Sequence, residues 1–301
     1  MLHTLLWGAF AAHAAEVAAN PCTAQSPASA ICRYPTGLLW KLERPDRNAA
    51  HKPSYLFGTI HVSDPRVINL PAPVRKVFDG ARSFTMELVR DDTGTAQLTK
   101  TMHFKKDGRT LRDMIGTERY AEVERAFDEY GLTLTDLNRK KPWAVAMLLS
   151  VPRQTGIALD LQLQLDAILQ RKPVHGLETM QEQLAVFNGL PMNDQIALVD
   201  HALRTRQEAD AQIEAMLQAY LARDLAGIMT LTDSVGLEDQ RLQATIVERL
   251  MSRRNLRMFE RIRPRLVEGN AFIAVGVAHL SGDNGLLPLL ERAGWRVTPI
   301  Y

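Results

Sequence analysis

Two short segments near opposite ends of the chain share a G-x-x-H pattern. Residues 56–61 read Leu-Phe-Gly-Thr-Ile-His, and residues 274–279 read Ala-Val-Gly-Val-Ala-His. Each is an apolar run in which a glycine stands three positions before a histidine, so His61 and His279 are expected at strand ends. Imidazole side chains bind metal ions and exchange protons near neutral pH. If the fold brings these two histidines together, they begin a metal or acid–base site.

Two glutamates are candidate acids for the same site. Glu87 stands inside an otherwise apolar run over 83–89, where a carboxylate is costly unless it is paired, hydrogen-bonded or metal-bound. Glu178 follows a Gly-Leu pair and is expected to open a helix, a position where the helix dipole also favours an ordinary acid. Asp160 is expected to be a surface or capping acid. Glu87 and Glu178 are therefore the predicted catalytic acids.

A basic stretch between residues 253 and 265 contains six arginines. In a solvated helix such a stretch is only a charged face. The functional interpretation places Arg254 and Asn255 at the site, where a guanidinium can clamp a carboxylate or stabilise an oxyanion. The histidines other than His61 and His279 lack a supporting pattern, and no role is assigned to them.

Several motifs of common hydrolases are absent from the sequence. It contains no H-E-x-x-H, no G-x-x-x-x-G-K-[ST], no paired C-x-x-C and no G-x-S-x-G. Their absence disfavours zincin proteolysis, phosphate-loop hydrolysis and serine-elbow ester hydrolysis. A formal net charge of only +2 over 301 residues also argues against nucleic-acid binding.

The predicted elements place the candidate residues at strand ends. Apolar runs predict strands at 38–42, 54–58, 83–89, 173–177, 271–275 and 295–299, and helical spacing predicts helices at 71–79, 118–130, 142–151, 158–170, 194–223, 237–267 and 285–293. The strand–helix–strand order over 54–89 is typical of a parallel sheet. In open α/β sheets ligands bind beyond the carboxyl ends of the strands, and both histidines and both glutamates fall at or near predicted strand ends.

We therefore expect an α/β fold with a central mixed or parallel sheet that is built from both chain ends. A large, mostly helical insertion at about 97–268 separates the two halves of this core. Residues 37–301 are expected to form a single domain. The composition, with 46% hydrophobic and 23% charged residues, is that of an ordinary globular protein.

The amino terminus indicates export. Residues 1–15 are apolar and rich in alanine, with an Ala-His-Ala segment typical of a signal-peptide cleavage site. The leader at 16–36 contains both cysteines of the chain, and a Cys22–Cys32 disulfide would persist in an oxidising compartment. The alternative is an apolar N-terminal helix followed by two unpaired thiols. No other run is long enough to span a bilayer, so we expect a periplasmic or secreted protein with no integral membrane segment in its mature chain.

An ordered set of motifs resembles the TraB/GumN family, which is related to the Tiki proteins. Residues 56–61 resemble its first signature. Three segments resemble its internal signatures: Lys141-Pro142-Trp143, Gly176-Leu177-Glu178-Thr179 with Gln183, and Arg254-Asn255. Its closing signature is similar to Val275-Gly276-Val277-Ala278-His279-Leu280, Gly282, Gly285-Leu286 and Gly294. The resemblance runs from residue 38 to residue 300. It implies an α/β fold shared with erythromycin-esterase-like and ChaN-like proteins.

The resemblance also implies a chemistry. Animal Tiki members are described as metal-dependent peptidases that act on secreted signalling proteins, whereas the chemistry of the bacterial relatives is much less clear. Carried over by motif, His61 and His279 are the site histidines, and Glu87 and Glu178 are the acids.

The sequence thus predicts an exported metal-dependent hydrolase with a peptide or protein substrate. His61, His279 and Glu87 are expected to bind a divalent ion (manganese, cobalt or zinc), with Glu178 as proton shuttle and the Arg-Asn pair at 254–255 orienting the substrate. Two alternatives stay open. One is a non-catalytic protein of the same fold that binds a peptide or glycan, and the other is a metal-independent hydrolase that uses His/Glu acid–base chemistry.

Overall fold

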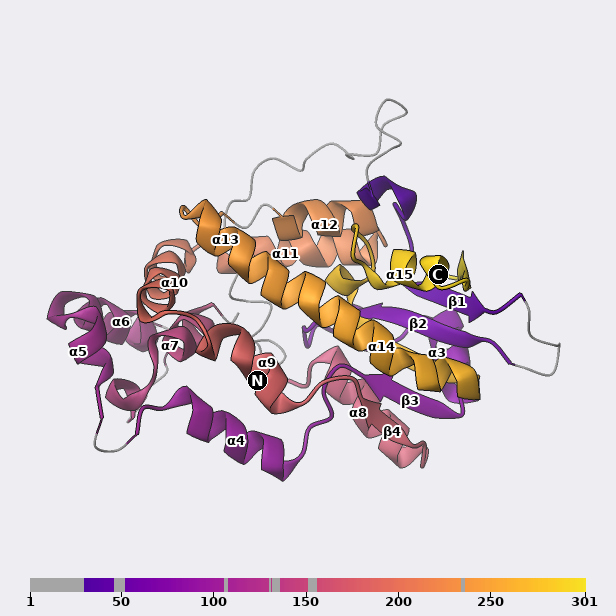
Figure 1. Cartoon of the computed structure of the whole chain (residues 1–301), viewed down its shortest axis with the longest axis horizontal. Helices are drawn as coiled ribbons and strands as arrows, with labels where there is room; N and C mark the ends of the chain where they lie inside the picture. Colours follow the sequence, from indigo (N-terminus) through magenta and orange to yellow (C-terminus); the bar gives the residue numbers. More distant parts are fainter. Residues whose placement is uncertain are drawn as a thin grey trace.

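In the computed structural model, a six-stranded mixed sheet lies at one end of an elongated molecule and helices fill the other end (Figure 1). The structure describes residues 30–45, 52–105, 108–129, 131, 136–150, 156–233 and 236–301. The predicted signal peptide and Cys22 lie outside the described residues, so export and the disulfide to Cys32 stay predictions. A bilayer-spanning helix is not found among the described residues.

The sheet is built from both ends of the chain, as predicted. Its order is β4-β3-β5-β2-β1-β6. The strands are β1 (Leu39–Glu43), β2 (Ser54–Thr59), β3 (Ser83–Met86), β4 (Val174–Gly176), β5 (Ala271–Gly276) and β6 (Arg296–Pro299). The four strands β4, β3, β5 and β2 run parallel, whereas β1 pairs antiparallel with both β2 and β6. The strands β2 and β3 are parallel, as the strand–helix–strand pattern predicts, but β5 lies between them.

The register of the central strands explains how the two G-x-x-H segments meet. The strand β5 is buried along its whole length, which its continuous apolar sequence favours because both faces of a parallel strand are covered. In its pairing with β2, Gly58 lies opposite Val275 and Thr59 lies opposite Gly276. The two histidine segments therefore leave neighbouring strands at the same edge of the sheet.

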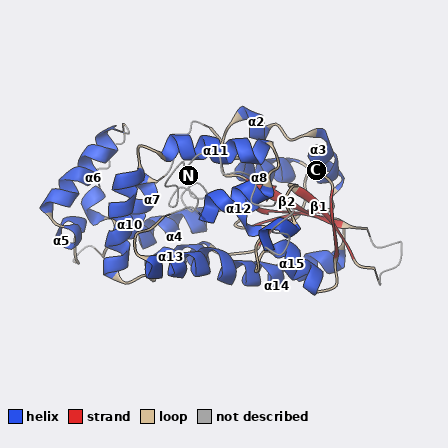
Figure 2. Cartoon of the chain, turned by 90° about the horizontal axis from the view of Figure 1, so that it is seen from above, coloured by secondary structure: helices blue, strands red, loops and turns tan. Residues whose placement is uncertain are grey.

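Helices cover both faces of the sheet and make up the rest of the molecule. They are α2 (Pro65–Ile68), α3 (Ala72–Gly80), α4 (Asp92–Met102), α5 (Leu111–Ile115), α6 (Thr117–Glu129), α7 (Pro142–Leu149), α8 (Leu159–Leu169), α9 (Met180–Asn188), α10 (Met192–Thr205), α11 (Ala209–Leu221), α12 (Leu225–Asp233), α13 (Gln240–Val247), α14 (Arg253–Glu268) and α15 (Leu286–Arg292). The helices α3 and α8 lie on one side of the strands, and α14 and α15 lie on the other (Figure 2). On the α3 side, the ring of Phe78 meets those of Phe84 and Phe272 edge-on at centroid distances of 5.7 and 5.2 Å.

The helical insertion is present, but its helices are shorter than the sequence pattern predicts. The helix expected at 194–223 is in fact two helices, α10 and α11, and the one expected at 237–267 is α13 and α14 joined by a π-helical turn (Glu248–Ser252). The apolar spacing continues across both breaks, so periodicity alone does not reveal them. A helix start was expected at Glu178, and α9 begins two residues later. A capping box fixes this start: Thr179 Oγ1 accepts from Glu182 N–H, and the Glu182 carboxylate accepts from Thr179 N–H.

Two hydrophobic clusters form the core. The first surrounds the sheet and contains Phe57, Phe84 and Phe272. The second lies among the helices of the insertion and contains Trp143 and Phe187, whose rings are stacked with a centroid distance of 6.4 Å. The chain crosses from one cluster to the other several times, and the polar residues discussed next lie at those crossings.

Candidate active site

Three chain segments pass between the two hydrophobic clusters, and each carries a buried charged residue where it crosses. We call the first cluster the sheet cluster and the second the insertion cluster. Along the chain, Glu87 stands between a residue of the sheet cluster and a residue of the insertion cluster. Glu178 and Arg254 likewise stand between residues of the two clusters in their own segments. All three residues are at most 5% exposed. A buried charge is costly unless an opposite charge and hydrogen bonds compensate it, so these three groups are expected to pair with one another.

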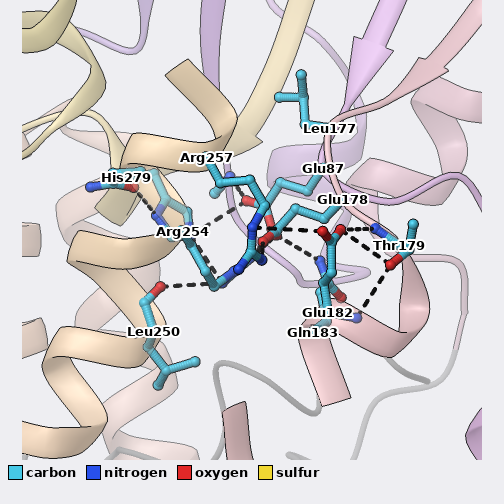
Figure 3. A network of polar contacts seen from close by, with 12 residues as sticks. Glu87, Leu177, Glu178, Thr179, Glu182, Gln183, Leu250, Arg254, Arg257 and His279 are labelled. Atoms are coloured by element: carbon cyan, nitrogen blue, oxygen red, sulfur yellow. Dashed lines mark hydrogen bonds and ion pairs between the residues drawn. The ribbon is translucent and has the colours of Figure 1, made fainter. Parts of the chain in front are cut away.

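Arg254 pairs with both carboxylates. Its Nη2 donates to Oε2 of Glu87 and to Oε2 of Glu178, at 2.6 Å each, and its Nε donates to the same Glu178 oxygen at 2.9 Å (Figure 3). Burial alone would lower the pKa of Arg254, but Glu178 and Glu87 outweigh burial and raise that pKa above its usual value. The guanidinium is therefore a fixed positive charge inside the molecule.

Glu178 is held on both carboxylate oxygens. Besides Arg254, its Oε2 accepts from Gln183 Nε2 at 3.3 Å, and its Oε1 accepts from Arg257 Nη1 at 3.1 Å. It precedes α9 rather than opening it, because Thr179 is the N-cap of that helix. This environment suits a carboxylate that positions arginines better than one that carries a proton to the substrate.

His279 is a neutral imidazole that faces Arg254. Its Nδ1 lies 2.5 Å from Oδ1 of Asn255, and since an amide oxygen only accepts, this nitrogen carries the hydrogen. The other nitrogen, Nε2, lies 3.2 Å from Arg254 Nη1 and accepts from it. Burial, partly opposed by Glu87, lowers the pKa of His279 to about 3, so the ring stays uncharged at neutral pH.

His61 is paired instead with Asp160. The distance from His61 Nδ1 to Asp160 Oδ2 is 2.5 Å, and Thr59 Oγ1 donates to the other carboxylate oxygen at 2.6 Å. Burial disfavours a charge on the ring, but Asp160 outweighs burial, and the pKa of His61 is raised above its usual value. The two histidines of the matching motifs thus have opposite titration behaviour.

Asp160 is a site residue that the sequence reading missed. The expectation of a surface or capping acid is wrong, because the residue is only 4% exposed on the inner side of α8. Spacing along the chain could not connect it to His61, since the contact joins residues 99 positions apart. The flanks give no clear signal either, because leucines alternate with polar residues over 159–165 and do not mark one face of the helix as buried.

Gly276 marks the point where the histidines and Glu87 converge. A Cβ atom at this glycine would lie 3.2 Å from Glu87 Oε1 and 3.6 Å from both His61 Nε2 and His279 Cδ2. The backbone N–H of Gly276 also donates to Glu87 Oε1 at 2.6 Å. The structure therefore brings all the predicted site residues together, while their roles stay predictions. With Asp160 added, this polar cluster consists of His61, Glu87, Asp160, Glu178, Arg254, Asn255 and His279.

The predicted metal ligands do not form a metal site as they lie. Among the described residues, no group of three or more His, Cys, Asp or Glu side chains is arranged to hold an ion. The reason is Arg254, which binds Glu87 and faces His279 Nε2, the atoms that were expected to bind the metal together with His61. A guanidinium cation stands among these ligands, so the donor set does not fit a divalent ion in this arrangement.

Comparison with known sequences gives a family and distant relatives. A sequence model of the TraB/PrgY/gumN family matches residues 38–299. The metalloprotease TIKI2 of Xenopus tropicalis is 26% identical over 86% of this chain and 59% of its own length, and the metalloprotease TIKI1 of Homo sapiens is 24% identical over 86% and 61%. The uncharacterized protein YbaP of Escherichia coli (strain K12) is 25% identical over 79% of this chain and 87% of its own length. The chain thus spans less than two thirds of each of these TIKI proteins, and no solved structure gives a significant match.

Proposed function

The chain belongs to the TraB/PrgY/gumN family, and from that membership we propose that it is a hydrolase that cleaves peptide bonds. The proposal rests on one observation. His61 Nε2 and Glu87 Oε1 both lie within 3.6 Å of the position that a Cβ atom at Gly276 would occupy. The polar cluster contains imidazoles and carboxylates, which are groups that can activate a water molecule. It also contains a fixed guanidinium, which can stabilise an oxyanion. The metalloprotease names of the TIKI relatives support a peptide or protein as the substrate class.

In this proposal His61 is the general base and Asp160 is its positioning residue. Because Nδ1 faces Asp160, Nε2 is the nitrogen directed towards the point at Gly276. Nε2 takes a proton from a water molecule as the water oxygen adds to the scissile carbonyl carbon. The same proton then passes to the amine that leaves when the carbon–nitrogen bond breaks. Asp160 raises the pKa of His61, which favours transfer of the proton from the water to Nε2.

Arg254 is proposed to stabilise the negative charge that develops on the carbonyl oxygen. Glu87 and Glu178 hold the guanidinium in place, so it needs no rearrangement during the reaction. One such preorganised donor contributes about 3 kcal/mol to transition-state stabilisation in a site from which water is excluded. Glu87, Glu178 and His279 are then positioning residues for Arg254. Arg254 and its three positioning residues are buried. A substrate therefore reaches Arg254 only when the side chains that cover it move.

The names of the TIKI relatives also support a divalent ion, which we predict to be manganese, cobalt or zinc. The present donor arrangement does not fit an ion while Arg254 bonds to Glu87. Elemental analysis of the purified wild type and of the His61→Ala/His279→Ala double variant distinguishes two forms of the proposal. An ion that the double variant loses supports the metal-dependent form, and full activity in the presence of a chelator supports His/Glu chemistry without a metal.

Digestion of a defined peptide mixture, followed by mass spectrometry, tests the hydrolase itself. We expect the wild type to give reproducible cleavage products. The Arg254→Met variant should give none of these products, although the variant is still folded at the assay temperature. Binding of peptides without any cleavage, with or without added divalent ions, would instead support the alternative of a non-catalytic peptide- or glycan-binding protein.

Export to the periplasm or the medium is a separate proposal, supported by the composition of residues 1–15. Sequencing the amino terminus of the protein recovered from its native host tests it. A mature chain that begins after this segment is the expected result, and an intact Met1 would contradict it.

A further inference from the structure

Arg90 carries a guanidinium that forms no ion pair with the described residues. It lies beyond the carboxyl end of β3, three positions after Glu87. Its Nε is buried without a hydrogen-bond partner, and no carboxylate of the described chain forms an ion pair with it. Burial lowers the pKa of Arg90, and the charge of Asp160 opposes this effect. A partly buried cation in this state loses hydration that no ion pair with a described acid replaces.

The backbone of Arg90 is fixed next to the proposed general base. Its N–H donates to Gln164 Oε1, and its carbonyl oxygen accepts from Gln164 Nε2, both at 3.2 Å. Gln164 lies on α8 one turn after Asp160, which in turn binds His61. This reciprocal amide pair places Arg90 on the same side of α8 as the Asp160–His61 pair.

The acid whose charge acts on Arg90 and the acid that follows Arg90 in the chain both have other hydrogen-bond partners. Both carboxylate oxygens of Asp160 accept hydrogen bonds, one from Thr59 and one from the His61 ring. Asp91, which follows in the chain, accepts from Gly94 N–H at the start of α4. Arg254 shows the contrast, because its guanidinium bonds to two buried carboxylates. The missing partner of Arg90 is therefore an anion from outside the described chain.

We propose that Arg90 binds a carboxylate of the peptide substrate, either the C-terminal carboxylate or an Asp or Glu side chain near the scissile bond. The planar fork of a guanidinium matches a carboxylate through two parallel hydrogen bonds, which gives orientation as well as affinity. A carboxylate held there would fix a peptide beside His61. The inference rests on the proposed peptide substrate, and it narrows that substrate to acidic peptides or to peptide C-termini.

Calorimetric binding to the full-length protein tests this without requiring turnover. The probes are alanine hexapeptides that end in a carboxylate, that end in a carboxamide, or that end in a carboxamide and contain one Asp. The variants are Arg90→Gln, Arg90→Lys and the control Arg82→Gln, which removes an exposed arginine at the opposite end of β3. We expect the wild type and Arg82→Gln to prefer one carboxylate probe over the neutral peptide by about tenfold or more.

Arg90→Gln should abolish this preference and leave binding of the neutral peptide unchanged, and Arg90→Lys should restore it in part. The probe that shows the effect distinguishes a C-terminal from a side-chain carboxylate. Equal affinity of the wild type for charged and neutral probes, or a preference that persists in Arg90→Gln, would overturn the proposal. If the wild type prefers a carboxylate probe but cleaves no peptide, the proposed hydrolase activity is refuted and the proposed anion site is supported. If the wild type cleaves peptides but shows no preference for a carboxylate, the anion site is refuted and the hydrolase activity is supported.

Discussion

The two motif histidines differ in their hydrogen-bond partners. His61 faces a carboxylate, which raises its pKa, whereas His279 faces an amide oxygen and a guanidinium, and burial lowers its pKa to about 3. Burial therefore favours the neutral form of His279, whereas Asp160 favours the charged form of His61. The shared G-x-x-H form predicts equal roles for both residues, but their partners lie far away in the sequence and make the roles different.

Substituting Asp160 by Asn tests the role of this partner. The amide keeps a hydrogen-bonding group beside His61 but removes the charge that raises the pKa of the ring, so that pKa should fall. Because the general base acts in its neutral form, the acidic limb of the pH–rate profile should move to lower pH. The maximal rate should drop about 10- to 100-fold, less than the full contribution of a general base. An unmoved limb would show that the pH dependence of the rate does not depend on the Asp160–His61 pair.

The glycines of the two motifs give a matched pair of variants. A Cβ at Gly276 would approach the Glu87 carboxylate and both imidazoles, whereas a Cβ at Gly58 would lie 2.7 Å from Leu280 Cδ1 and 3.0 Å from Val277 Cγ2. Gly276→Ala should lower turnover with little loss of stability. Gly58→Ala should overpack the core and cost about 1–3 kcal/mol of unfolding free energy. Urea unfolding combined with turnover measurements checks both, and the reverse pattern would contradict the site assignment.

At the scale of elements, the strands were more predictable than the helices. The five-residue β1 and the buried β5 follow directly from short apolar runs, and their ends place the G-x-x-H segments. The helices α10, α11, α13 and α14 keep a continuous apolar spacing across their breaks, so their lengths were not predictable. Glu87 lies one residue beyond β3 instead of inside a strand, because pairing ends at Met86.

The start of α14 is expected to depend on Arg254 for stability. Arg254→Met leaves Glu87 and Glu178 buried without their shared cation, which should lower the unfolding free energy by about 3–5 kcal/mol. The control is Arg253→Met on the same helix, where a 61%-exposed arginine pairs with Glu248. That substitution should cost at most about 1 kcal/mol. Equal losses in chemical denaturation would refute the buried network as a stabilising feature.

The helix α10 contains a second buried histidine with a strong acid dependence. Burial lowers the pKa of His201 to about 4, and its Nε2 has no partner within the described part of the chain. Below the unfolded-state pKa of about 6.5, the unfolded chain binds a proton that the folded chain does not, so stability falls as pH falls. This loss amounts to about 3 kcal/mol by pH 4.

His201→Leu removes this group while preserving its volume approximately. The variant should match or exceed the wild type in unfolding free energy at pH 7 and should lose about 2 kcal/mol less between pH 7 and pH 5. His279 contributes a similar acid dependence to both proteins and cancels in the comparison. Parallel pH curves for the two proteins, obtained by urea unfolding, would show that His201 does not contribute.

At the scale of the whole molecule, the polar cluster lies where the sheet cluster and the insertion cluster meet. The sequence alone predicted an α/β core from both chain ends, a helical insertion and six of the seven members of the polar cluster. It did not predict Asp160 or the pairing of Arg254 with both glutamates. Those features depend on contacts between residues 76 to 167 positions apart, which only the folded packing establishes.

The central claim is that the polar cluster hydrolyses peptides, with His61 as the general base and His279 as a positioning residue for Arg254. The most direct test is kcat/KM for one identified peptide, measured with the wild type, with His61→Ala/His279→Ala and with the control His175→Ala, whose half-buried ring contacts Arg265 outside the cluster. We expect the double variant to lose at least about 100-fold in kcat/KM while it stays folded, and the control to retain wild-type activity. Cleavage that continues at the wild-type rate in the double variant would contradict the assignment of the site.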